Sequence, residues 1–119
     1  MFENYDLFST AIQLRPGGVA EPGTADGTSL WSVGAFHADD DRAVHGHLWE
    51  RHPEGHEVLV VLSGSLHVHV RGEGLVTTLT AGRSFIVPPG RWHRLSVAEP
   101  GDLLSITPRI GTEHERVVA

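Results

Sequence analysis

Polar and apolar residues alternate with a period of two along several short stretches of the chain. In residues 66–70, for example, three aliphatic side chains alternate with His67 and His69. Neighbouring side chains of a strand point to opposite faces of a sheet, so this alternation predicts a strand with one buried face. No stretch shows a persuasive helical pattern. The whole chain is predicted to form strands at residues 8–14, 29–36, 44–52, 57–62, 66–70, 75–80, 84–87, 95–97 and 103–107.

Turn-forming residues separate the predicted strands. Gly72-Glu73-Gly74 is typical of a hairpin turn, and Pro53 ends a strand because proline cannot donate a backbone hydrogen bond. Residues 57–62 are almost all β-branched or aliphatic, which predicts a central strand buried on both faces. Eight or nine short strands with regular turns predict an all-β sandwich or jelly roll.

The size of the chain fits one domain. Its 119 residues are enough for a core without disulfides, and its 14 glycines and 7 prolines favour many turns over a helical bundle. We expect a single domain over residues 1–119, with its core at about 28–108. An N-terminal strand extension at 1–27 and a loose C-terminal tail at 109–119 flank that core. Residues 16–29, which run from the extension into the core, predict an irregular surface loop.

The charge of the chain narrows its possible partners. The formal net charge is -6, and all nine basic residues are arginines that form no basic run, which argues against a nucleic-acid partner. No apolar run approaches the length of a membrane span, and nothing resembles a signal peptide, so we expect no membrane partner and a cytoplasmic location. The absence of cysteine excludes disulfides and thiolate ligands.

Metal-competent side chains gather in two segments. Glu50 and His52 are two residues apart and share a strand face, and Glu57 follows a turn, where it can face back toward them. In the second segment, the stiff Pro88-Pro89-Gly90 turn can aim His93 rigidly at the same point. Imidazoles and carboxylates that converge suit a divalent transition metal such as iron, manganese, zinc or nickel.

The spacing in both segments resembles the two motifs of the cupin superfamily, G-x5-H-x-H-x3-4-E-x6-G and G-x5-P-x-G-x2-H-x3-N. The first motif is matched at His52, Glu57 and Gly64. The second is matched at Gly82, Pro88, Gly90 and His93. The string Trp-Glu-x-His-Pro-x-Gly-x-Glu is also similar to a group of small single-domain bacterial cupins of unassigned reaction. The resemblance implies a cupin jelly-roll barrel, also called a double-stranded β-helix, with one metal in its mouth.

The chain departs from these motifs at two positions. Glu50 stands where the first ligand histidine is usual, and Val97 replaces the terminal asparagine. His52, His93 and Glu57 would still supply the two histidines and one carboxylate of a non-haem iron oxygenase. Glu50 has three open roles: a fourth metal ligand, a side chain that orients His52, or a catalytic general base.

Two classes of function remain open at this stage. One is a metal-dependent enzyme, such as an oxygenase, an isomerase or a hydrolase, that acts on a small organic molecule. The alternative is a non-catalytic cupin that binds or senses a small ligand, with a structural metal or none. A metal-free, epimerase-like cupin with His52 as a base is a third possibility. The resemblance also implies a homodimer, because small cupin barrels commonly pair through edge strands.

Other side chains offer weaker signals. Trp92 and Arg91 adjoin His93 and are candidates for the rim of a substrate pocket, as is Trp31, although packing or solvent exposure would equally explain them. His67 and His69 suit an outer sheet face, a dimer interface or a second metal site. In a regular strand His45 and His47 face away from Glu50 and His52, and His56 faces away from Glu57; only a bulge would turn His47 inward.

Overall fold

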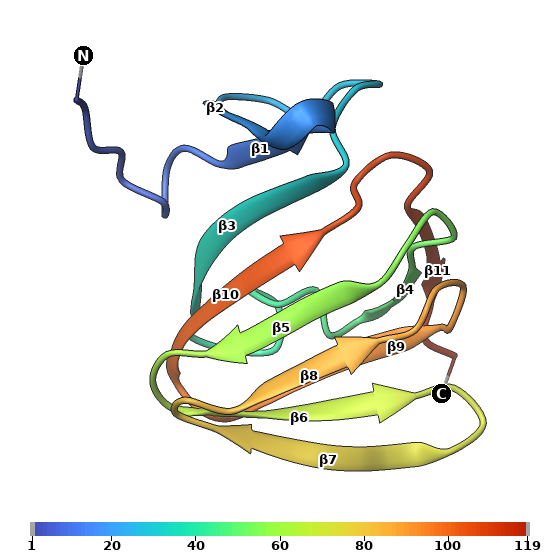
Figure 1. Cartoon of the computed structure of the whole chain (residues 1–119). Helices are drawn as coiled ribbons and strands as arrows, with labels where there is room; N and C mark the ends of the chain where they lie inside the picture. The colour runs from blue at the N-terminus through green and yellow to red at the C-terminus, as the bar shows by residue number, and fades with distance from the viewer. Residues whose placement is uncertain (1, 119) are drawn as a thin grey trace.

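Two antiparallel sheets account for nearly all of the regular structure. The computed structural model describes residues 2–118 and arranges their strands as a six-stranded sheet, in the order β2-β1-β3-β10-β5-β8, and a five-stranded sheet, in the order β11-β4-β9-β6-β7 (Figure 1). Consecutive strands repeatedly cross from one sheet to the other, as in a jelly roll. The all-β jelly-roll class expected from the sequence is confirmed.

The strands are short, and most of them coincide with the predicted ones. Their bounds are β1 (Ile12–Arg15), β2 (Val19–Pro22), β3 (Trp31–Ala38), β4 (Leu48–Arg51), β5 (Glu57–Val61), β6 (Ser65–Val70), β7 (Gly74–Thr80), β8 (Ser84–Val87), β9 (His93–Glu99), β10 (Gly101–Thr107) and β11 (Glu113–Arg116). A 3-10 turn, η1 (Pro16–Gly18), joins β1 to β2. Within residues 2–118 no helix is long and apolar enough to cross a membrane.

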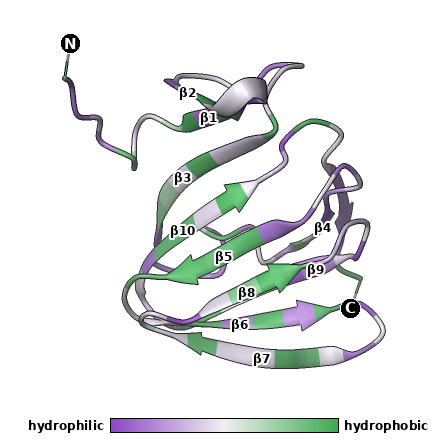
Figure 2. Cartoon of the chain, in the orientation of Figure 1, coloured by the Kyte–Doolittle hydropathy of each residue, from purple (hydrophilic) through white to green (hydrophobic). Residues whose placement is uncertain are grey.

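The core lies between the inner faces of the two sheets. On β6, the side chains of Leu66, Val68 and Val70 are buried, and the intervening histidines are only partly buried. Figure 2 shows the same alternation as apolar bands along the strands, with hydrophilic residues gathered at many of the turns. The period-two pattern of the sequence therefore fixes which side chains enter the barrel.

The outer face of β5 differs from the expectation. Residues 57–62 were expected to be buried on both faces, yet Val58 and Val60, which face out of the barrel, are only half-buried. The β5–β6 turn needs its glycine: Gly64 has a φ of +73°, and a Cβ there would collide with the Glu99 and Pro100 carbonyl oxygens.

Two regions predicted to be irregular contain strands. β2 lies inside the expected loop at 16–29 and pairs with β1. β11 lies inside the expected loose tail at 109–119 and pairs along its whole length with β4. All residues of both strands are exposed, so neither carries the alternation that marks a half-buried strand.

Two predicted strands begin four residues later than expected. At the first, Asp6 accepts backbone hydrogen bonds from Phe8 and Ser9, which turns the chain before β1 starts at Ile12. At the third, residues 41–47 form turns, because Asp40 and Asp41 accept hydrogen bonds from backbone amides. The acidic run 39–41 thus shapes a loop, and β4 begins only at Leu48.

Candidate metal centre

Four side chains converge where β4, β5 and β9 meet. Glu50 lies on β4 opposite His93 of β9, His52 directly follows β4, and Glu57 begins β5. One ligand atom from each of the four lies within 4.8 Å of the others. His52, Glu57 and His93 are buried and Glu50 is half-buried. The convergence of these four residues therefore follows the geometry predicted from their spacing.

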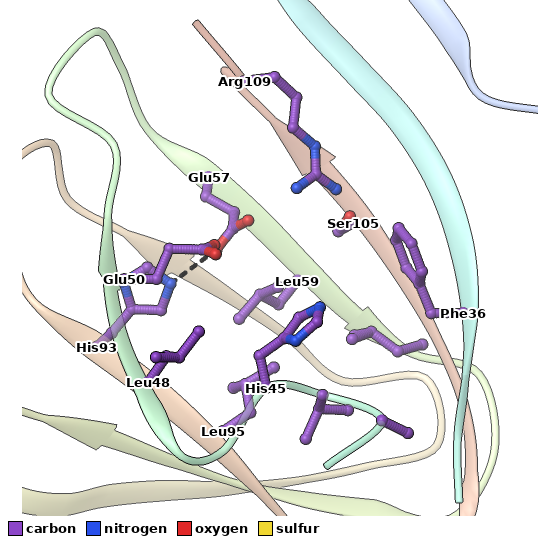
Figure 3. Close-up of a pocket in the computed structure, with 13 residues that line it drawn as sticks. Phe36, His45, Leu48, Glu50, Glu57, Leu59, His93, Leu95, Ser105 and Arg109 are labelled. Atoms are coloured by element: carbon purple, nitrogen blue, oxygen red, sulfur yellow. Dashed lines mark hydrogen bonds and ion pairs between the residues drawn. The ribbon is translucent and has the colours of Figure 1, made fainter. Parts of the chain in front are cut away.

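The contacts within this cluster run between histidine nitrogens and carboxylate oxygens. Nε2 of His93 is 3.0 Å from Oε1 of Glu57 (Figure 3). Nε2 of His52 is 2.9 Å from Oε1 of Glu50 and 3.3 Å from Oε2 of Glu57. Neither His52 contact has the geometry of a hydrogen bond, so this buried nitrogen has no hydrogen-bond partner among the described residues.

Groups outside the cluster contact each of its four side chains. His52 Nδ1 contacts the hydroxyl of Thr112 at 2.8 Å, and His93 Nδ1 contacts the carbonyl oxygen of Arg91 at 3.2 Å. The hydroxyl of Thr107 donates to Oε2 of Glu57 at 2.6 Å. His114 Nε2 contacts Oε2 of Glu50 at 2.6 Å. Two of these groups, Thr112 and His114, belong to the C-terminal segment that was expected to be loose.

These outer contacts determine which nitrogens face the centre. A carbonyl can only accept, so His93 Nδ1 donates to Arg91. Thr112 donates its own hydrogen to the Pro108 carbonyl at 3.3 Å, so its oxygen accepts from His52 Nδ1. In their neutral forms both imidazoles therefore point an Nε2 lone pair at carboxylate oxygens, which also carry lone pairs. That arrangement requires a cation between them, either a proton or a metal ion.

The pKa values of the cluster also indicate that its carboxylates require a cation. Burial by itself lowers the pKa of His52, but the close, negatively charged carboxylates of Glu50 and Glu57 outweigh it and raise that pKa to about 9. Burial raises the pKa of Glu57, yet His52 and His93 together hold it well below its usual range. The pKa of Glu50 is also lowered, against its own burial, chiefly by His52. The cluster thus stabilises its carboxylates as anions.

The donor set fits a divalent transition metal. Two carboxylates and two neutral imidazoles carry a charge that one divalent ion balances, and imidazole with carboxylate is a ligand mixture such ions accept. The unpartnered Nε2 of His52 is the atom whose environment a metal would complete. The described residues hold no other cluster of at least three such side chains within this spacing.

A cavity of about 120 Å³ opens in front of the cluster. Glu50, Glu57 and His93 form one end of it, and aliphatic side chains such as Leu59 and Leu95 form its floor (Figure 3). The remaining wall carries the aromatic and polar side chains of Phe36, His45, Ser105 and Arg109. This volume holds several water molecules or one small organic molecule.

The three side chains expected at the pocket rim lie elsewhere. Trp92 packs against the guanidinium groups of Arg51 and Arg71, whose carbons lie 4.6 and 4.9 Å from its ring centre. Arg91 pairs with Glu73 at 3.5 Å. Trp31 donates from its indole to the His56 carbonyl. None of the three lines the cavity. For Trp92 the reason is that it adjoins the inward-facing His93, and neighbours in an extended chain point to opposite sides.

Three further histidines divide between the outside and the cavity of the barrel. His67 and His69 lie on the outer side of β6, where they contact the hydroxyls of Thr78 and Ser96, in keeping with the outer-face alternative. His45 lines the cavity, although a regular strand would have turned it away. The reason is the turn at 41–47, in which His45 has a φ of 54°, the only positive value at a described non-glycine residue.

Sequence reasoning missed the far wall of the cavity. Ser105 shares the inner face of β10 with Leu103 and Thr107, so the period-two pattern could have placed it inside the barrel. Arg109 follows β10, and no local pattern marks it as a cavity residue. Phe36 comes from β3, which only the pairing of β3 with β10 brings to this wall.

Comparison with known proteins identifies the fold. A family model described as "Cupin domain" matches residues 42–107, more than half of the chain. A cupin-2 domain protein from Shewanella frigidimarina has a TM-score of 0.53 at 22% identity, over 72% of this chain and 76% of the other. An uncharacterized double-stranded β-helix protein from Klebsiella pneumoniae has a TM-score of 0.57 at 25% identity, over 73% and 76%.

More distant similarity extends to enzymes of the same fold. Hydroxypropylphosphonic acid epoxidase from S. wedmorenis has a TM-score of 0.54 at 19% identity, over 66% of this chain and 43% of the enzyme. At that identity the likeness concerns the fold alone. No match was found among curated proteins.

Proposed function

The chain belongs to the cupin family, and on that premise we propose that it is a metal-dependent enzyme acting on a small organic molecule in the barrel mouth. One observation carries the proposal. The buried Nε2 of His52 faces two carboxylates without a hydrogen bond, and the cluster that contains it opens onto a cavity of small-molecule size. A structural polar cluster would have no need of that opening.

We propose His52, Glu57 and His93 as the buried ligands of one divalent ion, with iron, manganese, zinc and nickel as candidates. Glu50 is the fourth ligand through Oε1, because His114 already holds Oε2. When bound, such an ion acts as a Lewis acid and polarises an oxygen of the small organic molecule in the cavity. Thr112, Arg91 and Thr107 keep the side chains of His52, His93 and Glu57 in place, and the apolar floor of the cavity excludes bulk water from that end.

Metal content tests the proposal directly. Untagged wild-type protein is analysed by plasma mass spectrometry beside His52→Ala and His93→Ala, with circular dichroism to show that each variant is folded. Near-stoichiometric metal in the wild type, lost in both variants, is the expected result. The control is His67→Ala, which removes a histidine from the outer face and is expected to keep the metal. Folded wild type that takes up no iron, manganese, nickel or zinc would contradict the proposal.

Glu50 requires a separate variant, because it is also the candidate general base. If Glu50 is a metal ligand, Glu50→Gln is expected to lower metal affinity, since a neutral amide binds the ion less well than a carboxylate. Full metal affinity in Glu50→Gln would instead assign Glu50 to proton transfer in the cavity that it lines.

A non-catalytic binding module is the second candidate, and the presence of four protein side chains favours it. A metal closed by four protein ligands is typical of a structural site, whereas a catalytic site keeps a position open to water. Water-proton relaxation of the manganese-loaded protein separates the two. Strong enhancement indicates exchangeable water on the ion and supports the enzyme; no enhancement supports the binding module.

A second copy of the chain is the proposed protein partner. The apolar residues Val58, Val60, Ile86, Leu104 and Ile106 lie side by side on the outer face of the six-stranded sheet. Ile86 is 59% exposed, and none of the five is charged, so two such faces can meet without like-charge contacts. This surface supports pairing through the sheet face in place of the edge strands expected from the family resemblance.

A further inference from the structure

We infer that the cavity binds the carboxylate of a small organic acid, which Arg109 and Ser105 hold on the β10 side of the cavity, beside the metal-ligand cluster. This inference rests on the proposed function, because it assigns the substrate class of the same site. It draws on side chains outside the cluster itself, from the end of β10 and the residue that follows Pro108.

The first support is the guanidinium of Arg109. It is directed into the cavity, between Glu57 and Phe36 (Figure 3), and its carbon lies 5.9 Å from the centre of the Phe36 ring. Within residues 2–118 it forms no ion pair with a carboxylate, whereas four other arginines do: Arg15, Arg51, Arg71 and Arg91. An arginine fork directed into a cavity matches the geometry of a carboxylate.

The second support is independent of charge. Ser105 is 4% exposed, and its hydroxyl is buried on the inner face of β10 without a hydrogen-bond partner among the described residues. Leaving a buried hydroxyl unpaired costs free energy, and such groups in native proteins usually have a partner. Because Ser105 lines the same wall as Arg109, a ligand oxygen placed there would accept hydrogen bonds from both.

The rest of the cavity sets the shape of the acid. Leu59, Leu95 and Leu103 lie among the lining residues and suit a short apolar body. Glu50 and Glu57 at the cluster end would repel an anion unless a divalent ion balances them. The ligand therefore directs its carboxylate toward Arg109 and Ser105 and a neutral oxygen function toward the metal, which describes a hydroxy acid or oxo acid.

Ligand-dependent thermal stability tests the inference in the metal-loaded protein. The probes are acetate, lactate, pyruvate and succinate, each beside its neutral amide at equal ionic strength. At least one carboxylate is expected to raise the melting temperature of the wild type, whereas its amide has no such effect. In Arg109→Gln the affinity for that carboxylate is expected to fall about tenfold or more, and in Ser105→Ala by a smaller factor.

Two controls separate a ligand contact from a structural role. Arg83→Gln removes an exposed arginine at the β7–β8 turn, outside the cavity, and is expected to bind the carboxylate as the wild type does. Without ligand, Ser105→Ala is expected to melt at the same temperature as the wild type or higher, because it removes an unpaired hydroxyl. Stabilisation by the ligand should nevertheless decrease in that variant.

Three results would overturn the inference: equal effects of acids and amides, unchanged affinity in Arg109→Gln, or stabilisation by inorganic phosphate with none by any carboxylate. Metal content measured on the same samples keeps the two proposals apart. Full metal in the wild type and in Arg109→Gln, without a carboxylate effect, overturns this inference alone. A wild type without metal overturns the proposed function and, because its unbalanced carboxylates would repel an anion, this inference with it.

Discussion

Thr112 controls His52 through one hydrogen bond. Its hydroxyl is committed to donating to the Pro108 carbonyl, so it accepts from His52 Nδ1 and leaves Nε2 to face Glu50 and Glu57. A partner of this kind fixes the ring orientation of a ligand histidine and makes its other nitrogen a better donor to a metal. The residue that selects the binding nitrogen thus lies outside both sequence motifs.

Replacement of that partner gives the first prediction at this scale. Thr112→Val keeps the side-chain volume and removes the acceptor, so metal affinity is expected to fall about 10- to 100-fold while the fold is retained. Competition with a metal-binding dye measures it. Thr78→Val, which removes the equivalent hydroxyl beside His67 on the outer face, is the matched control and is expected to leave metal affinity unchanged. Equal affinities in both variants would contradict the role of Thr112.

The pH dependence of the metal-free protein gives the second prediction. The pKa of His52 is raised from 6.5 to about 9, so its contribution to stability is complete below pH 6.5 and is lost as pH rises through 9. The lowered pKa values of Glu50 and Glu57 contribute stability above pH 4.5 that is lost as pH falls. Melting temperatures of chelator-treated protein should therefore peak between pH 4.5 and 6.5.

Bound metal should change that profile. A metal ion replaces the protons of the cluster and competes with them, so its stabilising effect is expected to increase toward alkaline pH. The difference in melting temperature between metal-loaded and metal-free protein measures this effect. His52→Gln should remove the alkaline decline from the metal-free curve; a decline that persists there would assign it to another group.

At the scale of elements, the turn at 41–47 carries His45 into the cavity. Backbone hydrogen bonds from Gly46 to Asp41 and from His45 to Arg42 hold the turn, and His45 adopts the left-handed conformation that costs an ordinary residue about 1–2 kcal/mol. The strained backbone thus belongs to a residue beside the candidate site, and backbone strain is common at functional sites.

Glycine substitution in this turn gives the third prediction. His45→Gly removes the conformational cost but adds chain entropy to the unfolded state. Its free energy of unfolding is therefore expected to equal that of the wild type or to exceed it by up to about 1 kcal/mol. His47→Gly, two residues on and without a positive φ, lacks that relief and is expected to lose about 0.4–1 kcal/mol. Urea unfolding measures both; equal losses would show that the His45 backbone stores no strain.

The sequence predicted the half-buried strands well because burial on one face leaves an alternating pattern. That pattern identified β6 and its inward side chains, and motif spacing identified the four side chains of the cluster. It missed β2 and β11, which are exposed throughout and are held by backbone pairing that side-chain polarity does not reveal. Arg109 was missed because it follows β10 and no local pattern marks it, whereas the period-two pattern of β10 could have placed Ser105 inside the barrel.

At the scale of the molecule, the outer face of the six-stranded sheet gives the fourth prediction. If two copies pair through this face, Ile86→Lys places a charge in an apolar contact and is expected to convert a dimer to a monomer. Size-exclusion chromatography with light scattering measures the mass. The control is Leu75→Lys on β7, which is comparably exposed at 53% but lies in the other sheet. A wild-type monomer, or dissociation by both substitutions alike, would contradict this interface.

The position of β11 bears on how fast a metal ion could enter or leave the cluster. β11 is an edge strand of four exposed residues that pairs only with β4, yet its segment supplies the groups behind His52 and Glu50. Short edge strands open more readily than the strands of a core. Each detachment of β11 would withdraw Thr112 and His114 together, so the exchange rate of the ion should follow the opening rate of this strand. Such a strand would set the rate of metal exchange at a centre whose ligand-bearing strands lie inside the sheets.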